Sequence, residues 1–142
     1  EGPLYSYIKT NLNKLNISYE MLGNLQPEEV SYFLRKSNGF LLPSLNDPNP
    51  LSAIEGLASG IPLLLSNYCG NINECVVVNK NGWIFNPYDK VELSNTIKAW
   101  SLSSFKQLNE MGSFSKLRYK ELFSIDKVCH EFANNLFSII NT

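Results

Sequence analysis

Residues 42–62 read LPSLNDPNPLSAIEGLASGIP, and this stretch marks the beginning and the end of one helix. Asn49 is a good N-cap residue, Pro50 suits the first helical position, and Gly60 suits the position that ends a helix. Apolar runs flank the helix on both sides, at residues 40–42 and 62–65. A strand, a loop, a helix and a second strand in this order are typical of a parallel α/β sheet.

The rest of the chain continues this alternation. Apolar residues at helical spacing predict further helices, and short apolar runs between turn residues predict further strands. The predicted helices cover residues 4–15, 27–38, 50–59, part of 70–78, a segment capped by Asp89 and most of 105–140, and the predicted strands cover residues 17–22, 40–42, 62–65 and 83–85. We therefore expect an α/β domain with a Rossmann-like parallel sheet and helices on both faces. In such sheets ligands bind beyond the carboxyl ends of the strands.

Composition and charge narrow the class of protein. The chain has 142 residues, 44% of them hydrophobic and 18% charged, with a net charge of −1 and a pI near 5.8. We expect one domain, with neither nucleic acid nor a strongly anionic membrane as partner. No apolar run approaches the ~20 residues of a membrane helix. The three cysteines, Cys69, Cys75 and Cys129, lack metal-ligand spacing and are expected to be buried or partly buried thiols in a reducing cytoplasm. His130 is expected to be a surface or packing residue.

The helix predicted at residues 50–59 follows a strand-end loop directly. The amides of Leu51, Ser52 and Ala53 then lack carbonyl partners within the helix, and with the helix dipole they form a site for a phosphate or diphosphate. Helical spacing places Leu51, Ile54, Leu57 and Ala58 on the core side, and Ser52, Glu55 and Ser59 on another side.

Glu55 has two interpretations. As a carboxylate one turn from the anion site, it can accept two hydrogen bonds from a vicinal diol such as a ribose. As the last residue of Ser52-x-x-Glu55, it can instead complete a capping box that only stabilises the helix start. The local sequence leaves both open.

Short motifs recur at fixed distances along this part of the chain: Pro43-Ser44, Asp47, Glu55 after seven intervening residues, Gly60-Ile61-Pro62, Gly70-Asn71, Glu74 and Asn81-Gly82. Their type, order and spacing resemble the second domain of the family-four, or group-one, retaining glycosyltransferases, which have the two-domain GT-B architecture. Gly2-Pro3-Leu4 and Leu22-Gly23 resemble earlier turns of that domain, so the similarity covers roughly residues 1–100.

The resemblance implies roles for named residues. Glu55 would contact the ribose of a nucleoside-diphosphate sugar, and Asp47 the hydroxyls of its sugar. Asn49, Pro50, Leu51 and Ser52 would surround the phosphate, Gly70 and Asn71 would lie near the sugar, and the loop after Gly23 would lie near the base. No metal or other cofactor is expected.

Three features depart from the family pattern. Asp47 stands where Glu is usual, which shortens the reach of the carboxylate by one methylene. Pro50 stands where many members have Gly, and proline has no N–H to offer a phosphate. The opening strands of the domain would precede Glu1, and with them its usual basic residues. Arg35 and Lys36 are expected to be solvated at a helix end rather than to replace them.

The implied function is transfer of a hexosyl group with retention, from the nucleotide sugar to a sugar or lipid-linked acceptor. Residues 1–142 would form a partial C-terminal donor-binding domain, inactive alone, and the acceptor would bind a missing N-terminal domain. Asn49-Pro50-Leu51-Ser52 resembles variants in polysaccharide pathways, and the expected role is in cell-envelope polysaccharide or glycoconjugate synthesis. A separate expectation is a cytoplasmic location, at the inner face of the membrane for the full-length protein. The alternative is a non-catalytic nucleotide-binding or regulatory doubly wound domain.

Overall fold

The computed structural model describes residues 2–140 and divides the chain into two compact units, Glu1–Val30 and Ser31–Thr142. In the first unit, α1 (Tyr5–Lys14) confirms the helix predicted at residues 4–15. The chain leaves this helix through Asn16, whose φ of 48° lies in the left-handed region that asparagine tolerates. α2 (Pro27–Lys36) begins in this unit with Glu28 and Glu29 in its first turn, as predicted.

The strand predicted at residues 17–22 is wrong. This segment has no regular secondary structure and pairs with no strand among residues 2–140. Ile17 is 53% exposed and Leu22 is 42% exposed. A strand is stabilised by hydrogen bonds to a neighbouring strand, so an apolar run without such a neighbour does not form one.

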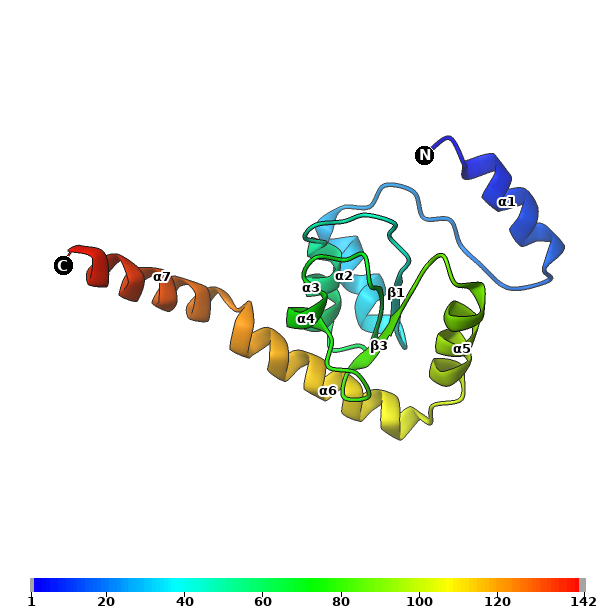
Figure 1. Ribbon diagram of the computed structural model, residues 1–142. Helices are drawn as coiled ribbons and strands as arrows, with labels where there is room; N and C mark the ends of the chain where they lie inside the picture. The colour runs from blue at the N-terminus through cyan, green and yellow to red at the C-terminus, as the bar shows by residue number, and fades with distance from the viewer. Residues whose placement is uncertain (1, 141–142) are drawn as a thin grey trace. The chain divides into compact units, whose positions relative to one another are not determined.

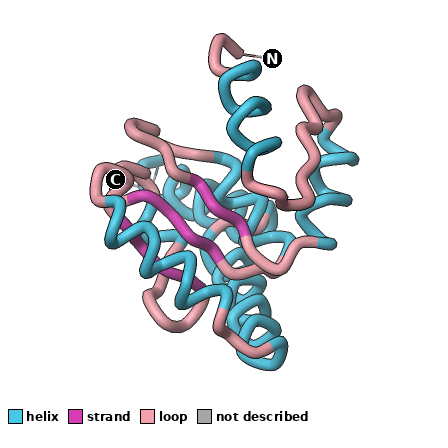
Figure 2. Tube along the Cα trace, turned by 90° about the vertical axis from the view of Figure 1, so that its right-hand side faces the viewer, coloured by secondary structure: helices cyan, strands magenta, loops and turns pink. Residues whose placement is uncertain are grey.

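The second unit is built on a parallel sheet with the strand order β1-β2-β3 (Figures 1 and 2). The strands are β1 (Phe40–Leu42), β2 (Leu63–Ser66) and β3 (Gly82–Phe85). Leu41 lies opposite Leu64, which in turn lies opposite Trp83. Helices α3 (Leu51–Ser59), α4 (Ile72–Cys75) and α5 (Lys90–Ser101) follow the strands, and α6 (Phe105–Leu122) and α7 (Ile125–Ile140) complete the chain. The α/β parallel fold is confirmed.

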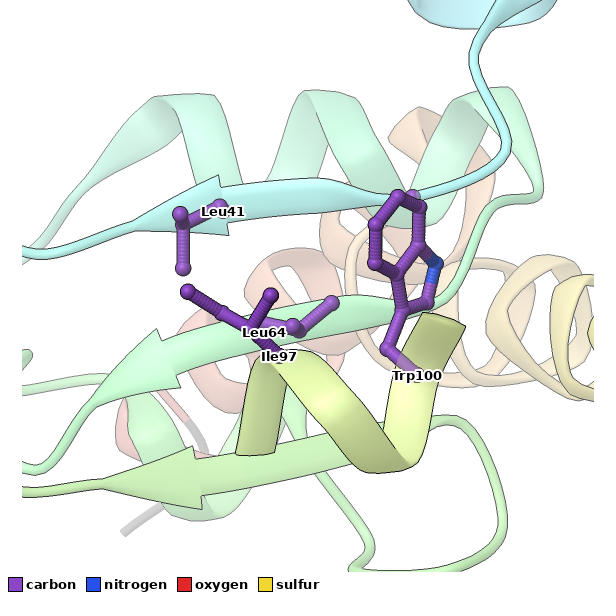
Figure 3. Close-up of a pocket in the computed structure, with 5 residues that line it drawn as sticks. Leu41, Leu64, Ile97 and Trp100 are labelled. Carbon is purple, nitrogen blue, oxygen red and sulfur yellow. The ribbon is translucent and has the colours of Figure 1, made fainter. Parts of the chain in front are cut away.

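The two faces of the sheet carry alternate residues of each strand. On one face Leu63 and Leu65 pack with Ala53 and Leu57 of α3 in the main buried cluster. On the other face Leu41 and Leu64 point toward Ile97 and Trp100 of α5, around a small apolar pocket of about 90 Å³ (Figure 3). The Trp100 indole N–H donates to the Asn38 carbonyl at 3.2 Å, which ties α5 to the start of β1. Leu41 is still 43% exposed, so β1 is less buried than predicted.

The buried side of α3 differs from the predicted core side and includes two small residues. This side consists of Ala53, Gly56 and Leu57, whereas Leu51 is 67% exposed and Ala58 is also exposed. A Cβ added to Gly56 would lie 2.7 Å from the Leu63 side chain, so glycine lets the helix approach the sheet closely. The predicted core side, with Leu51 and Ala58, was therefore wrong in part.

α6 crosses the end of α3 through another small residue. Gly112 is buried, and a Cβ added there would lie 2.1 Å from the Gly60 carbonyl oxygen. Nearby, the Ser115 hydroxyl donates to the Ile61 carbonyl at 2.9 Å. Phe105, predicted to belong to the apolar face of α6, is 73% exposed because the helix instead packs through Gly112 and Ser115.

Gly112→Ala is expected to lower the free energy of unfolding by about 1–3 kcal/mol, because the added methyl group meets backbone that cannot turn aside. Ser113→Ala, one residue along the same helix and exposed, is the matched control. Urea unfolding of both variants measures the difference. Since alanine favours helix formation over glycine, a stabilised Gly112→Ala variant would contradict the close crossing.

α7 presents an apolar stripe that the sheet does not cover. The residues of this stripe are exposed and do not pack on the sheet: Val128 by 49%, Phe132 by 65%, Leu136 by 43% and Ile140 by 73%. Cys129 is also exposed, which corrects the prediction of a buried thiol there, whereas Cys69 and Cys75 are buried as predicted. His130 is a surface residue that contacts the Asn134 amide at 3.0 Å. No helix within the described residues is long and apolar enough to cross a membrane.

Candidate functional site

The carboxyl ends of the three strands bring their loops together by backbone hydrogen bonds. Asp47 N–H donates to the Tyr68 carbonyl at 3.2 Å, and Gly70 N–H donates to the Asp47 carbonyl at 2.8 Å. Asn67 N–H donates to the Phe85 carbonyl at 2.9 Å, which links the loops after β2 and β3. The predicted site segments 43–50 and 67–71 therefore lie side by side at the sheet edge where ligands bind in α/β folds.

Asp47 lies at the centre of this junction. Its backbone bridges to the loop after β2, and one oxygen of its half-buried carboxylate, Oδ1, accepts a hydrogen bond from Asn49 N–H at 3.3 Å. The carboxylate is thereby oriented by its own loop, while its other oxygen can still accept a hydroxyl hydrogen. This geometry is compatible with the predicted sugar contact, which stays a prediction.

Gly70 is required at its position because the backbone of Pro48 comes too close for any side chain. A Cβ there would lie 2.0 Å from the Pro48 carbonyl oxygen, a distance that no side chain tolerates. Glycine thus lets the two loops touch through their backbones.

Asn71 joins the second loop to the start of α3. Its side-chain amide donates to Asn49 Oδ1 at 3.0 Å and to the Pro50 carbonyl at 3.2 Å. The side chain is almost wholly buried at 8% exposure, yet its carbonyl oxygen Oδ1 has no hydrogen-bond partner among residues 2–140. Asn49, Pro50 and Asn71, predicted separately, form one hydrogen-bonded group.

The start of α3 lies one residue later than predicted. The N-cap is Pro50, with no side-chain hydrogen bond to the helix, and Asn49 is therefore not the cap. The Ala53 amide donates to the Pro50 carbonyl at 3.2 Å, so it is not a free donor either. The amides of Leu51 and Ser52 remain as the predicted anion-binding donors of the first turn.

Glu55 lies on the exposed side of α3, one turn from the helix start. The capping-box interpretation is wrong, because Ser52 lies within the helix and two residues after the N-cap. Within the described residues, no hydrogen bond or ion pair engages the Glu55 carboxylate. The ribose contact stays a prediction.

Gly23 belongs to the first unit and is described there alone. Its φ of 67° lies in the left-handed region, which accounts for glycine at this turn. Its predicted place near the nucleobase stays a prediction.

An exposed aromatic pair at this edge was not predicted. Tyr68 and Tyr88, from the loops after β2 and β3, make an edge-to-face contact with ring centroids 5.4 Å apart. Aromatic residues shortly after two strand ends were the available signal.

Cys69 lies next to Tyr68 in the chain. Burial and then the Asp47 carboxylate raise the pKa of the Cys69 thiol, so this cysteine is not an activated nucleophile.

Asn81, part of the Asn-Gly motif before β3, is a structural residue. It is fully buried, its Oδ1 accepts from Val77 N–H at 2.8 Å, and its Nδ2 donates to the Cys75 carbonyl at 2.9 Å and to the Ser115 hydroxyl at 3.4 Å. These bonds connect the segment after α4 to α6. Arg118 of α6 holds α4 itself, because its guanidinium donates to the Asn73 carbonyl at 2.6 Å.

Comparisons with known proteins agree with this geometry. The family model described as Glycosyl transferases group 1 matches residues 1–118. An uncharacterized glycosyltransferase of Methanocaldococcus jannaschii is 32% identical over 96 residues, which is 65% of this chain and 27% of that protein. The chain therefore belongs to the group 1 glycosyl transferases.

Solved structures share the fold. Sucrose-phosphate synthase of Thermosynechococcus elongatus superimposes with a TM-score of 0.80 at 21% identity, over 96% of this chain and 34% of that one. Anabaena HepE, solved in complex with UDP and glucose, superimposes with a TM-score of 0.76 at 17% identity, over 95% of this chain and 37% of that one. The fold is thus the Rossmann-like α/β fold of GT-B glycosyltransferases, and this chain spans only about a third of each of these two structures.

Proposed function

We propose that this chain is the C-terminal, donor-binding domain of a retaining glycosyltransferase and that it holds a nucleoside-diphosphate sugar at the carboxyl edge of its sheet. The observation that supports the proposal most is the hydrogen-bonded junction of the loop carrying Asp47 and Asn49 with the loop carrying Gly70 and Asn71. The junction adjoins the start of α3, where the Leu51 and Ser52 amides can bind an anion.

In this proposal each part of the donor has a partner. The first turn of α3 binds the diphosphate and stabilises the negative charge that grows on it as the glycosidic bond breaks. Glu55 accepts hydrogen bonds from the ribose hydroxyls, and Asp47 from hydroxyls of the hexose. Retention at the anomeric carbon, a sugar or lipid-linked acceptor held by a second domain, and a pathway of polysaccharide synthesis are further proposals. A cytoplasmic place at the inner face of the membrane stays a prediction.

The test is donor turnover by the complete enzyme. Purified protein is incubated with UDP-, GDP- and ADP-hexoses and mixed acceptors, and release of the nucleoside diphosphate is followed. Nuclear magnetic resonance of the product gives the anomeric configuration. Turnover of none of these donors would overturn the proposal, and would favour the non-catalytic nucleotide-binding or regulatory doubly wound domain in its place.

Metal chelation is expected to leave the activity nearly unchanged. Among residues 2–140 no group of three or more His, Cys, Asp or Glu side chains lies together in a way that could hold a metal ion. Helix amides and the helix dipole are the proposed counter-charge for the diphosphate. Rates with and without EDTA should differ by less than about twofold. Strict dependence on Mg²⁺ or Mn²⁺ would contradict this assignment of the counter-charge.

A further inference from the structure

The start of α3 lacks one hydrogen-bond donor that other residue types would provide there. Pro50 is the N-cap, and proline has no backbone N–H. The Ala53 amide is engaged by the Pro50 carbonyl, so two amides remain in the first turn. A diphosphate has several anionic oxygens, and each of them prefers a charge-assisted hydrogen bond.

The Asn49 side chain lies directly before this turn and carries an NH₂ group. Its Oδ1 accepts a hydrogen bond from Asn71 Nδ2 at 3.0 Å, and this bond fixes which end of the Asn49 carboxamide faces Asn71. The NH₂ end, with two hydrogens, must then face away from Asn71. Asn49 is exposed, and among residues 2–140 its NH₂ group has no hydrogen-bond partner.

Asn71 is built to hold that orientation. Its NH₂ group donates one hydrogen to Asn49 Oδ1 and the other to the Pro50 carbonyl. If the Asn71 carboxamide were turned over, its oxygen would face the Pro50 carbonyl oxygen and the bond to Pro50 would be lost. Its buried Oδ1 has no hydrogen-bond partner among the described residues, so Asn71 is held by its two donor bonds. These bonds fix the Asn49 carboxamide relative to the start of α3.

We infer that the Asn49 NH₂ group binds the diphosphate of the donor, in the place of the N–H that Pro50 lacks, and that Asn71 is the positioning residue that orients it. This inference rests on the proposed binding of a nucleoside-diphosphate sugar at α3, and it adds a specific ligand contact to it. Asn49 touches the ligand, whereas Asn71 acts only through Asn49 and Pro50.

Substitution by aspartate separates this role from a structural one. Asn49→Asp keeps an acceptor for Asn71 but replaces the NH₂ group by a charged oxygen. If Asn49 only anchors Asn71 and its side chain lies away from the ligand, Asn49→Asp keeps wild-type binding while Asn49→Ala weakens it. If Asn49 binds phosphate, the order reverses: Asn49→Ala weakens binding about tenfold and Asn49→Asp about a hundredfold, because like charges then repel.

The experiment measures binding of UDP, GDP and ADP to the complete enzyme by calorimetry and continues with the tightest of the three. The matching nucleoside, which has no phosphate, is titrated in parallel and should bind Asn49→Ala as it binds the wild type. Asn71→Ala should lose about threefold to tenfold in affinity for the nucleotide, and adding it to Asn49→Ala should cause a smaller loss than it causes in the wild type, because only its bond to Pro50 then remains to be lost. Asn46→Ala, an exposed asparagine of the same loop, is the control.

Each outcome decides between the two proposals. If the wild type binds none of the nucleotides, the proposed function fails. If the wild type binds and Asn49→Asp binds equally well, only the role of Asn49 is overturned. An equal loss of nucleoside and nucleotide binding in Asn49→Ala would also overturn it, since a phosphate contact cannot affect a ligand without phosphate.

Discussion

Replacing Glu55 by glutamine is expected to lower use of the donor about ten- to a hundredfold while the free energy of unfolding stays the same. Glu55 is exposed on α3, and within the described part of the chain no partner depends on its charge. A charge-assisted hydrogen bond to a ribose hydroxyl contributes roughly 1.5–3 kcal/mol, and glutamine keeps the shape of the side chain but not its charge.

Kinetics and unfolding must be measured on the same Glu55→Gln preparation. The KM for the donor should rise and the melting temperature should stay within about 1 °C of the wild type. Glu121→Gln, another exposed glutamate on a helix of this unit, should change neither quantity. A lower melting temperature with normal donor use would mean that Glu55 stabilises the helix and does not bind the donor.

Asn81→Ala is expected to lower the free energy of unfolding by about 3–5 kcal/mol, the largest stability effect we predict. The substitution leaves Val77 N–H and the Cys75 carbonyl without their partner, the first in a partly buried place and the second in a buried one. Each unpaired buried group costs about 1–3 kcal/mol, and the lost side-chain volume adds to this.

Tryptophan fluorescence during urea unfolding measures this effect, because Trp83 and Trp100 both lie in the second unit. Asn109→Ala removes an exposed asparagine from α6 and is expected to stay within about 0.5 kcal/mol of the wild type. Asn81→Asp tests the donor bonds separately, since it keeps an acceptor for Val77 but directs oxygen toward the Cys75 carbonyl. A loss below about 1 kcal/mol in Asn81→Ala would show that the network contributes little.

Local signals in the sequence predicted the elements that local interactions determine. Gly60 ends α3 with a φ of 73°, in the left-handed region that glycine adopts at the ends of helices, as predicted. Asp89 caps α5 by accepting hydrogen bonds from Val91 N–H and Glu92 N–H. The strand at residues 17–22 failed because an apolar run cannot indicate whether a partner strand lies beside it.

The parts of the site that could not be predicted depend on contacts between distant residues. The hydrogen bond from Asn71 to Asn49 spans 22 residues, and no pattern in either segment indicates it. The same holds for Gly70, which faces the Pro48 carbonyl, and for Gly112, which faces the Gly60 carbonyl. A glycine in the sequence shows that a side chain is absent but not which backbone occupies the space.

The hydrogen bonds of α6 also determine when the site is completed during synthesis. Ser115 holds the Ile61 carbonyl 54 residues earlier, and Arg118 holds the Asn73 carbonyl 45 residues earlier. A nascent chain that has reached the end of β3 therefore contains every predicted donor-site residue but not the helix that fixes the segment next to Asn71. Because contacts between distant residues form late, we expect the segment next to Asn71 to become fixed only after α6 has left the ribosome.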